Sequence, residues 1–220
     1  EWIAECDCDD YWLETCKLQR QMILIRKHGA VLCVTDYLIR DVRDNRLYMY
    51  VLPTTEIIPP REFAQAYYQT NTLLYSRAAY EQMVREIPLD FQGDTRKEQC
   101  LARYGKVVCL HDVASIWHVG GGAYSSRSEA NKAMIVILSQ LALFRYGPRA
   151  AKKAHAITVL TVLRQALHPK TGFSAQEWQE IRPFILPLVK HVFWRLLPNP
   201  TAISLYLKIR SRARRLHAAN

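Results

Sequence analysis

The chain has 220 residues, half of them apolar, and a formal net charge of +10 at pH 7. This apolar content suffices for a folded core and excludes an intrinsically disordered chain. No apolar run reaches the about 18 residues that a membrane-spanning helix needs, and the first residues show no signal-peptide pattern, so we expect a cytoplasmic protein.

The cysteines agree with that expectation. They are Cys6, Cys8, Cys16, Cys33, Cys100 and Cys109. In a chain without a secretory pattern we expect reduced and mostly buried thiols. The spacing of the first three matches no usual pattern of zinc ligands.

The chain opens with a short apolar run that ends in three acids within four positions. Residues 2–12 read W-I-A-E-C-D-C-D-D-Y-W and place Asp7, Asp9 and Asp10 directly after a predicted strand. Asp7 and Asp9 are two residues apart, so on an extended chain both side chains point to one face, where their oxygen atoms suit Mg²⁺ or Mn²⁺. The alternative is structural: Asp9 or Asp10 caps the next helix and interacts favourably with its dipole. The three acids alone leave both interpretations open.

Residues up to 126 predict helices and strands in alternation. In chain order we expect a helix over 12–28 closed by Gly29, strands over 30–37 and 46–52, a short helix over 61–69, a strand over 71–76, a helix over 77–87, a polar turn over 90–94, a helix over 95–104, and two strands over 106–110 and 113–119 joined by a His-Asp turn. Three glycines at 120–122 follow the last strand. This succession is typical of an α/β fold.

Beyond residue 126 the pattern predicts helices alone, over roughly 128–146, 149–167, 174–195 and 201–216. We therefore divide the chain into an α/β region, 1–126, and a helical region, 127–220. The positive charge lies in the second region. Residues 141–220 hold 14 Lys and Arg against two acids, a net charge of +12, whereas residues 1–140 have a net charge of −2.

Four local patterns occur in a fixed order. They are D-C-D-D-Y-W at 7–12, N-T-L-L-Y-S-R at 71–77, G-D at 93–94 followed by a helix and Y-G-K-V at 104–107, and S-I-W-H-V-G-G-G-A-Y-S at 115–125. Together they resemble the later part of a family-2 glycosyltransferase of the GT-A type, an α/β domain with a Rossmann-like mixed sheet that binds a nucleotide-sugar. The resemblance covers residues 1–126. Because the chain begins at Glu1, directly on the first pattern, we expect it to lack the family's base-binding first half. A further alternative is therefore that this chain alone is inactive.

The resemblance implies a metal-dependent, inverting enzyme that transfers a sugar from a UDP- or GDP-sugar to a glycan or lipid-linked acceptor, in bacterial cell-surface polysaccharide synthesis. It implies that Asp9, assisted by Asp7, holds Mg²⁺ or Mn²⁺, and that both acids contact the donor. It implies that Asp94 is the catalytic base; the alternative is that Asp94 caps its helix. The chain departs from the family at His118, where arginine is usual, and at Gly120, where a histidine is common. His118 is then the residue expected to contact the diphosphate.

Residues 181–215 mix apolar and basic side chains. This composition suits binding to an anionic membrane surface, here the inner face of the cell membrane; the alternative is that the apolar faces pack on the α/β region. A different class of function is a basic nucleic-acid-binding module without catalysis. The chain contains no recognised nucleic-acid motif, so nucleic acid is not the expected partner.

Overall fold

The computed structural model describes residues 1–52, 55–64, 66–87, 94–120, 132, 135–136, 139–140, 143, 146–152, 155–158, 161 and 179, without the side chains of 94–96. The chain divides into two compact units, one of Glu1–Ser126 with Ala142–His155 and one of Arg127–Leu141 with Ala156–Asn220. Every helix and strand named below belongs to the first unit. The helices expected beyond residue 126 lie largely outside the described residues and stay predictions.

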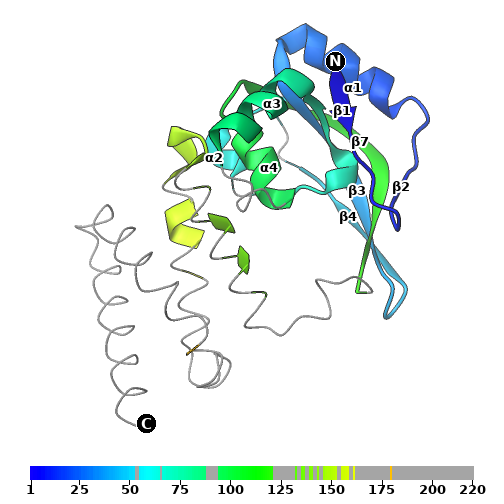
Figure 1. The fold of residues 1–220 in the computed structure, drawn as a ribbon. Coiled ribbons are helices and arrows are strands. Elements are labelled where there is room, and N and C mark those ends of the chain that lie inside the picture. The colour runs from blue at the N-terminus through cyan, green and yellow to red at the C-terminus, as the bar shows by residue number, and fades with distance from the viewer. Residues whose placement is uncertain are drawn as a thin grey trace. The chain divides into compact units, whose positions relative to one another are not determined.

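The described strands form one mixed sheet in the order β1-β6-β3-β7-β2, with β4 paired to β3 and β5 paired to β7 (Figure 1). The strands are β1 (Trp2–Ala4), β2 (Tyr11–Trp12), β3 (Ala30–Asp41), β4 (Arg46–Tyr50), β5 (Ile57–Ile58), β6 (Leu74–Ser76) and β7 (Lys106–Val119). Only the β3–β7 pair is parallel among these described pairs. Because β6 is antiparallel to both β1 and β3, the strands β1, β3 and β7 run in one direction, and their carboxyl ends lie at the same edge of the sheet.

Helices cover both faces of this sheet, as the alternation of side chains along β3 requires. The helix α1 (Lys17–His28) packs on one face, where Cys33 of β3 meets Leu24 and Ile25. On the other face Leu32 and Val34 belong to the larger core, to which the helices α2 (Pro60–Phe63), α3 (Arg77–Glu86) and α4 (Asp94–Leu101) contribute. Figure 1 shows α1 on the opposite side of the sheet from α3 and α4.

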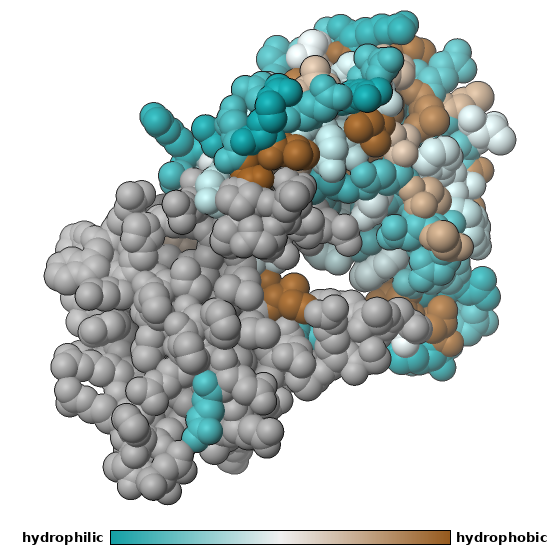
Figure 2. Space-filling model, in the orientation of Figure 1, coloured by the Kyte–Doolittle hydropathy of each residue, from teal (hydrophilic) through white to brown (hydrophobic). Residues whose placement is uncertain are grey.

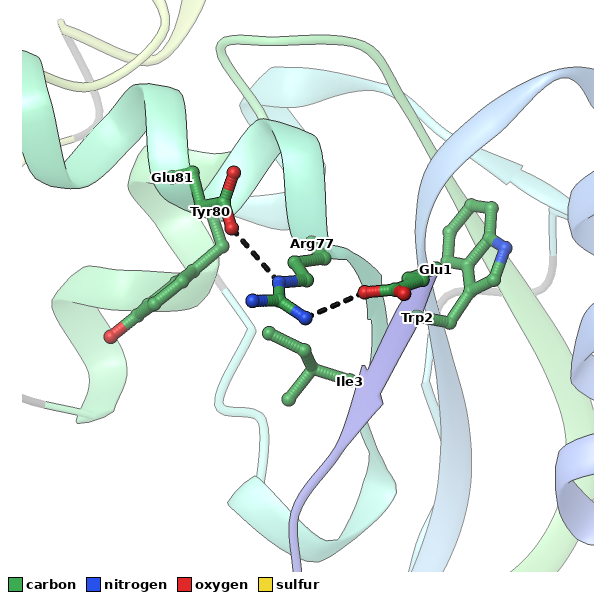
Figure 3. A pocket seen from close by; sticks show the side chains of 6 residues that line it. All are labelled: Glu1, Trp2, Ile3, Arg77, Tyr80 and Glu81. Carbon is green, nitrogen blue, oxygen red and sulfur yellow. Dashed lines mark hydrogen bonds and ion pairs between the residues drawn. The ribbon is translucent and has the colours of Figure 1, made fainter.

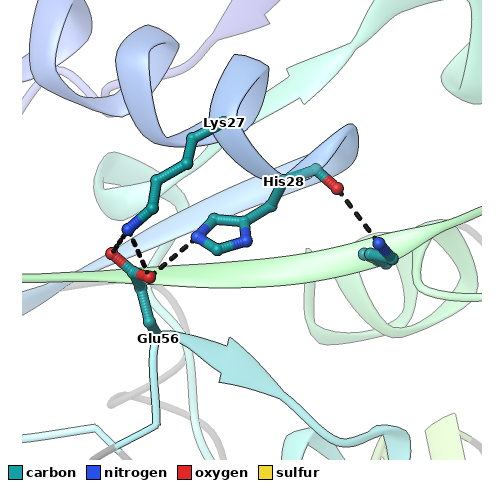
Figure 4. Close-up of polar contacts among 4 residues, drawn as sticks. Lys27, His28 and Glu56 are labelled. Atoms are coloured by element: carbon teal, nitrogen blue, oxygen red, sulfur yellow. Dashed lines mark hydrogen bonds and ion pairs between the residues drawn. The ribbon is translucent and has the colours of Figure 1, made fainter.

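The end of α1 is fixed by backbone geometry and by charge. Gly29 has φ 60° and ψ 42°, the left-handed conformation that glycine adopts without steric cost, and its N–H donates to the Ile25 carbonyl. Lys27 Nζ and His28 Nε2 both bind the Glu56 carboxylate just before β5, at 2.8 Å and 2.7 Å (Figure 4). These contacts tie the basic last turn of α1 to the segment that pairs with β7.

The α/β class predicted from the sequence is confirmed, and several predicted bounds are wrong. The helix expected over 12–28 begins only at Lys17, because Tyr11 and Trp12 pair with β7 as β2. Cys16 occupies its N-cap position, so Asp9 and Asp10 do not cap this helix. The helix expected over 61–69 ends at Phe63. The two strands expected over 106–110 and 113–119 are one strand with an irregularity at the predicted turn.

The described surface is mainly polar, with apolar residues in scattered patches (Figure 2). Leu47 and Met49 of β4 are among the exposed apolar residues. Among the described residues, no helix combines the length and the hydropathy needed to cross a membrane. Residues 181–215 lie outside the described residues.

Candidate functional site

The acidic stretch forms a tight turn at the carboxyl end of β1. Pairing of β1 with β6 stops at Ala4, and the backbone N–H of Asp10 donates to the Asp7 carbonyl at 3.0 Å. Asp7 and Asp9 are both exposed on this turn. The expected extended arrangement of these two acids is therefore wrong, because the strand ends before them; what remains is a pair of exposed carboxylates on one turn.

Asp10 anchors the turn to two distant segments. Its side chain is only 2% exposed. One carboxylate oxygen, Oδ1, accepts a hydrogen bond from the backbone N–H of His118 at 3.1 Å, and the other, Oδ2, accepts one from the Asn71 side-chain amide at 3.1 Å. The same amide also donates to the Ile116 carbonyl at 2.8 Å. The acidic turn, the segment before β6 and the end of β7 thus meet at one buried carboxylate.

Burial raises the pKa of Asp10, and the hydrogen bond from the His118 N–H opposes that shift. The neighbouring carboxylates Asp9 and Asp7 raise the pKa of Asp10 further. Both oxygens of Asp10 are hydrogen-bonded, so this buried residue orients the turn, on which Asp7 and Asp9 are exposed.

The two aromatic residues after the acids hold the turn in place. Trp12 Nε1 donates to the Asn71 carbonyl at 2.9 Å. The Tyr11 ring lies against the His118 ring, with centroids 5.5 Å apart. Beneath them the buried Lys17 ammonium lies 4.7 Å from the centroid of the Trp12 ring, and burial lowers the pKa of Lys17 to about 8. The turn therefore sits on a packed support.

His118 is the residue that the sequence predicts to contact the diphosphate of the nucleotide-sugar donor. Its Nδ1 is 4.0 Å from Asp10 Oδ1 and makes no hydrogen bond to a described residue. The ring is mostly buried, with 18% of the side chain exposed. The contact of His118 with a diphosphate stays a prediction.

The helix that begins with Asp94 is tied to the segment just before the acidic turn. Asp94 is the first residue of α4, and its side chain lies outside the described residues. One turn later, the Lys97 ammonium pairs with the Glu5 carboxylate and lies over the Tyr75 ring. The beginning of α4 therefore lies close to the carboxyl end of β1.

An open pocket lies at the other end of β1. Its lining residues are Glu1, Trp2, Ile3, Arg77, Tyr80 and Glu81 (Figure 3). The Arg77 guanidinium is held between the carboxylates of Glu1 and Glu81, at 2.6 Å and 2.8 Å. This pocket contains none of the residues predicted for the site, and its central cation is already paired.

Sequence reasoning missed the residues that assemble the site. Asn71 donates to Asp10, and Trp12 donates to the Asn71 carbonyl, although neither was singled out as a site residue. The segment 69–72 is polar and is nevertheless buried in the fold, so its local sequence gave no signal of the role of Asn71. A second missed group, on β3 and β7, is described below.

The chain matches no protein-family model and no curated protein. The assignment to a family therefore stays a prediction that rests on the four patterns and on the contacts that join them.

Proposed function

We propose that this chain takes part in metal-dependent, inverting sugar transfer from a UDP- or GDP-sugar to a glycan or lipid-linked acceptor, as part of a GT-A-type domain. The observation that carries the proposal is the convergence on Asp10. Three of the four patterns that resemble the family meet there through hydrogen bonds from Asn71 and His118. The fourth, at the start of α4, is linked to the same region through the Lys97–Glu5 ion pair.

The position of the turn in the sheet supports this function. In open α/β sheets, ligands bind beyond the carboxyl ends of parallel strands. The acidic turn follows the carboxyl end of β1, and His118 lies at the carboxyl end of β7, which runs in the same direction. A nucleoside diphosphate bound at this edge would lie within reach of both the acidic turn and His118.

The donor set of the turn fits a hard divalent cation. Asp7 and Asp9 offer exposed carboxylate oxygens, and Mg²⁺ is commonly held by one or two carboxylates together with substrate phosphates and water. Asp10 is left out of the ligand set because its oxygens already accept hydrogen bonds. When bound, Mg²⁺ or Mn²⁺ supplies Lewis-acid stabilisation of the charge that develops on the departing nucleoside diphosphate.

In the proposed reaction, Asp94 accepts the proton of the acceptor hydroxyl. The hydroxyl oxygen forms the new bond to the anomeric carbon from the face opposite the donor oxygen. The bond to that oxygen breaks, and its electron pair leaves with the nucleoside diphosphate. General-base assistance of this kind accelerates a reaction by about 10²- to 10⁴-fold.

A lipid-linked acceptor would bring the chain to a membrane surface, and the basic composition of residues 181–215 is what supports that part of the proposal. Flotation with vesicles that contain anionic lipid, compared with neutral vesicles, tests it. Equal recovery with both kinds of vesicle would exclude an electrostatic membrane contact.

The donor site is tested by binding of UDP and GDP to the full chain with and without Mn²⁺, measured by calorimetry. We expect Mn²⁺-dependent binding that is lost in Asp9→Asn. The matched control is Asp44→Asn, an exposed aspartate in the turn between β3 and β4, which should bind as the wild type does. Unchanged binding in Asp9→Asn would contradict the metal assignment.

The base is tested separately from binding. Asp94→Asn should keep Mn²⁺-dependent nucleotide binding and reduce sugar transfer, measured as nucleoside diphosphate release, by about 10²- to 10⁴-fold. Transfer at the wild-type rate in this variant would show that Asp94 is not the base.

A further inference from the structure

Three potential metal ligands of different chemistry gather between β3 and β7. They are the Asp36 carboxylate, the Cys109 thiol and the His111 imidazole, whose ligand atoms all lie within 4.8 Å of one another. His111 Nδ1 is 3.5 Å from Asp36 Oδ2 and 3.7 Å from Cys109 Sγ. This cluster is separate from the acidic turn and plays no part in the function proposed above.

A bulge in β7 creates the cluster. The pairing runs from Thr35 with Leu110 directly to Asp36 with Val113, so His111 and Asp112 are extra residues on β7. Bulges of this kind redirect side chains and are common next to functional sites. Asp112 reaches Arg20 of α1 at 2.6 Å, whereas His111 lies beside Asp36.

The spacing of the ligand atoms matches a tetrahedral zinc site. Zinc binds nitrogen and oxygen at about 2.0–2.1 Å and sulfur at about 2.3 Å, so neighbouring ligand atoms in a tetrahedron are about 3.3–3.6 Å apart. The two separations that involve His111, 3.5 Å and 3.7 Å, are close to these values, and the third, between Asp36 and Cys109, is at most 4.8 Å. His111 therefore already lies at ligand spacing from both of its partners.

The surrounding contacts hold two of the ligands in place and leave the third near solvent. Asp36 Oδ1 accepts a hydrogen bond from the Leu52 backbone N–H at 2.8 Å, which leaves Oδ2 directed to the cluster. The Cys109 backbone N–H donates to the Glu56 carbonyl at 2.9 Å. Asp36 and Cys109 are buried, whereas the His111 side chain is 36% exposed, so water can supply a fourth ligand. Three protein ligands with an open fourth position is the arrangement of zinc sites that bind water or a substrate.

We propose that Asp36, Cys109 and His111 form a zinc-binding site with one position open to solvent. A thiolate and an imidazole favour zinc over the hard cations that suit the all-oxygen acidic turn. The chain would therefore hold two chemically distinct cation sites on one sheet.

The probe is Co²⁺, which replaces zinc and reports its ligands in the absorption spectrum. To remove competing exposed thiols, the background is the full chain with Cys6→Ser, Cys8→Ser and Cys16→Ser. We expect one equivalent of Co²⁺ to give a thiolate-to-metal charge-transfer band and the intense visible bands of a tetrahedral site. Zn²⁺ should abolish both bands stoichiometrically, and a hundredfold excess of Mg²⁺ should leave them unchanged. Absence of the charge-transfer band in this background would overturn the proposal.

Variants assign the ligands. Cys109→Ser should remove the charge-transfer band, and His111→Ala should weaken Zn²⁺ binding by more than the about 10- to 100-fold that loss of an outer-shell partner costs. His111 is exposed, so His111→Ala should fold, as circular dichroism can verify. The matched control is Cys33→Ser, a buried thiol on β3 outside the cluster, which should keep the band. A band that survives Cys109→Ser, or unchanged Zn²⁺ affinity in folded His111→Ala, would refute the site.

Discussion

The hydrogen bond between Asp10 and Asn71 is a measurable support of the candidate site, and a double-mutant cycle isolates it. In Asn71→Ala the chain loses a hydrogen bond to a buried carboxylate and one to the Ile116 carbonyl. The first contributes about 1.5–3 kcal/mol and the second about 0.5–1.5 kcal/mol. We therefore expect the free energy of unfolding to fall by about 2–4.5 kcal/mol in Asn71→Ala.

The cycle compares Asp10→Ala, Asn71→Ala and the double variant. Asp10→Ala also removes the bond from the His118 N–H, but that loss is the same whether or not Asn71 is present. The double variant should therefore be less destabilised than the sum of the two single variants by the energy of the shared bond, about 1.5–3 kcal/mol.

Urea unfolding at pH 7, followed by far-ultraviolet circular dichroism, measures each free energy. The matched control cycle pairs Asp10→Ala with Gln21→Ala. Gln21 is a buried amide that also binds the segment before β6, through the Thr72 carbonyl at 2.9 Å. Gln21 hydrogen-bonds Lys17, Cys33 and Thr72, none of which binds the Asp10 side chain, so this cycle should be additive within about 0.5 kcal/mol. Equal coupling in the two cycles would refute the assignment of Asp10 as a specific anchor.

Two further predictions concern the supports of α1. Burial lowers the pKa of Lys17 from 10.5 to about 8, so above about 8 the folded protein releases a proton that the unfolded chain keeps until about 10.5. The unfolding free energy of the wild type, relative to that of Lys17→Met, should therefore rise by about 3 kcal/mol between about pH 8 and pH 10.5. This gain is lost again as the pH falls to about 8. A difference that does not change with pH would show that Lys17 is not desolvated. Gly29→Ala should lower the unfolding free energy by about 1 kcal/mol, because φ is 60° and nothing lies within 4 Å of the added methyl group, so strain is the whole effect. Chemical unfolding measures this change in free energy. Asparagine tolerates this backbone conformation better than alanine does, so Gly29→Asn should lower the unfolding free energy less. An equal decrease in the two variants would contradict the strain argument.

Local sequence was sufficient for the features that depend on neighbouring residues. The apolar run before the acids predicts β1, Gly29 predicts the end of α1, and Ser76 caps the helix expected from residue 77, accepting from the Ala79 N–H. These signals act within a few residues, so no knowledge of the rest of the fold is needed.

The features that were mispredicted depend on distant partners. His111 and Asp112 interrupt an apolar run as a turn would, and only the continued pairing of β7 with β3 makes them a bulge. Trp12 has the local setting of a helix residue, but its pairing with Ser115 makes it a strand residue. Lys17 is another such case, because a lysine in the first turn of a helix predicts exposure, whereas this one is buried.

For the candidate site, the sequence predicted individual residues but not the contact that brings them together. Asp7, Asp9 and His118 were predicted, and the structure places them around one turn and the strand end beside it. The residue that brings them together, Asn71, gives no local signal of its role. A buried polar contact between segments far apart in the chain is decided by the assembled fold.

The Asp10 anchor also has a consequence for the order of folding. It joins residues that are 61 and 108 positions apart in the chain. Contacts between such distant residues carry a large loop-closure entropy and form slowly compared with helices and hairpins. We expect α1 and the β3–β4 hairpin to form early and the acidic turn to become ordered only when β7 joins the sheet. A newly made chain would then order its acidic turn as one of the last steps of folding, after most of the core is already protected from solvent.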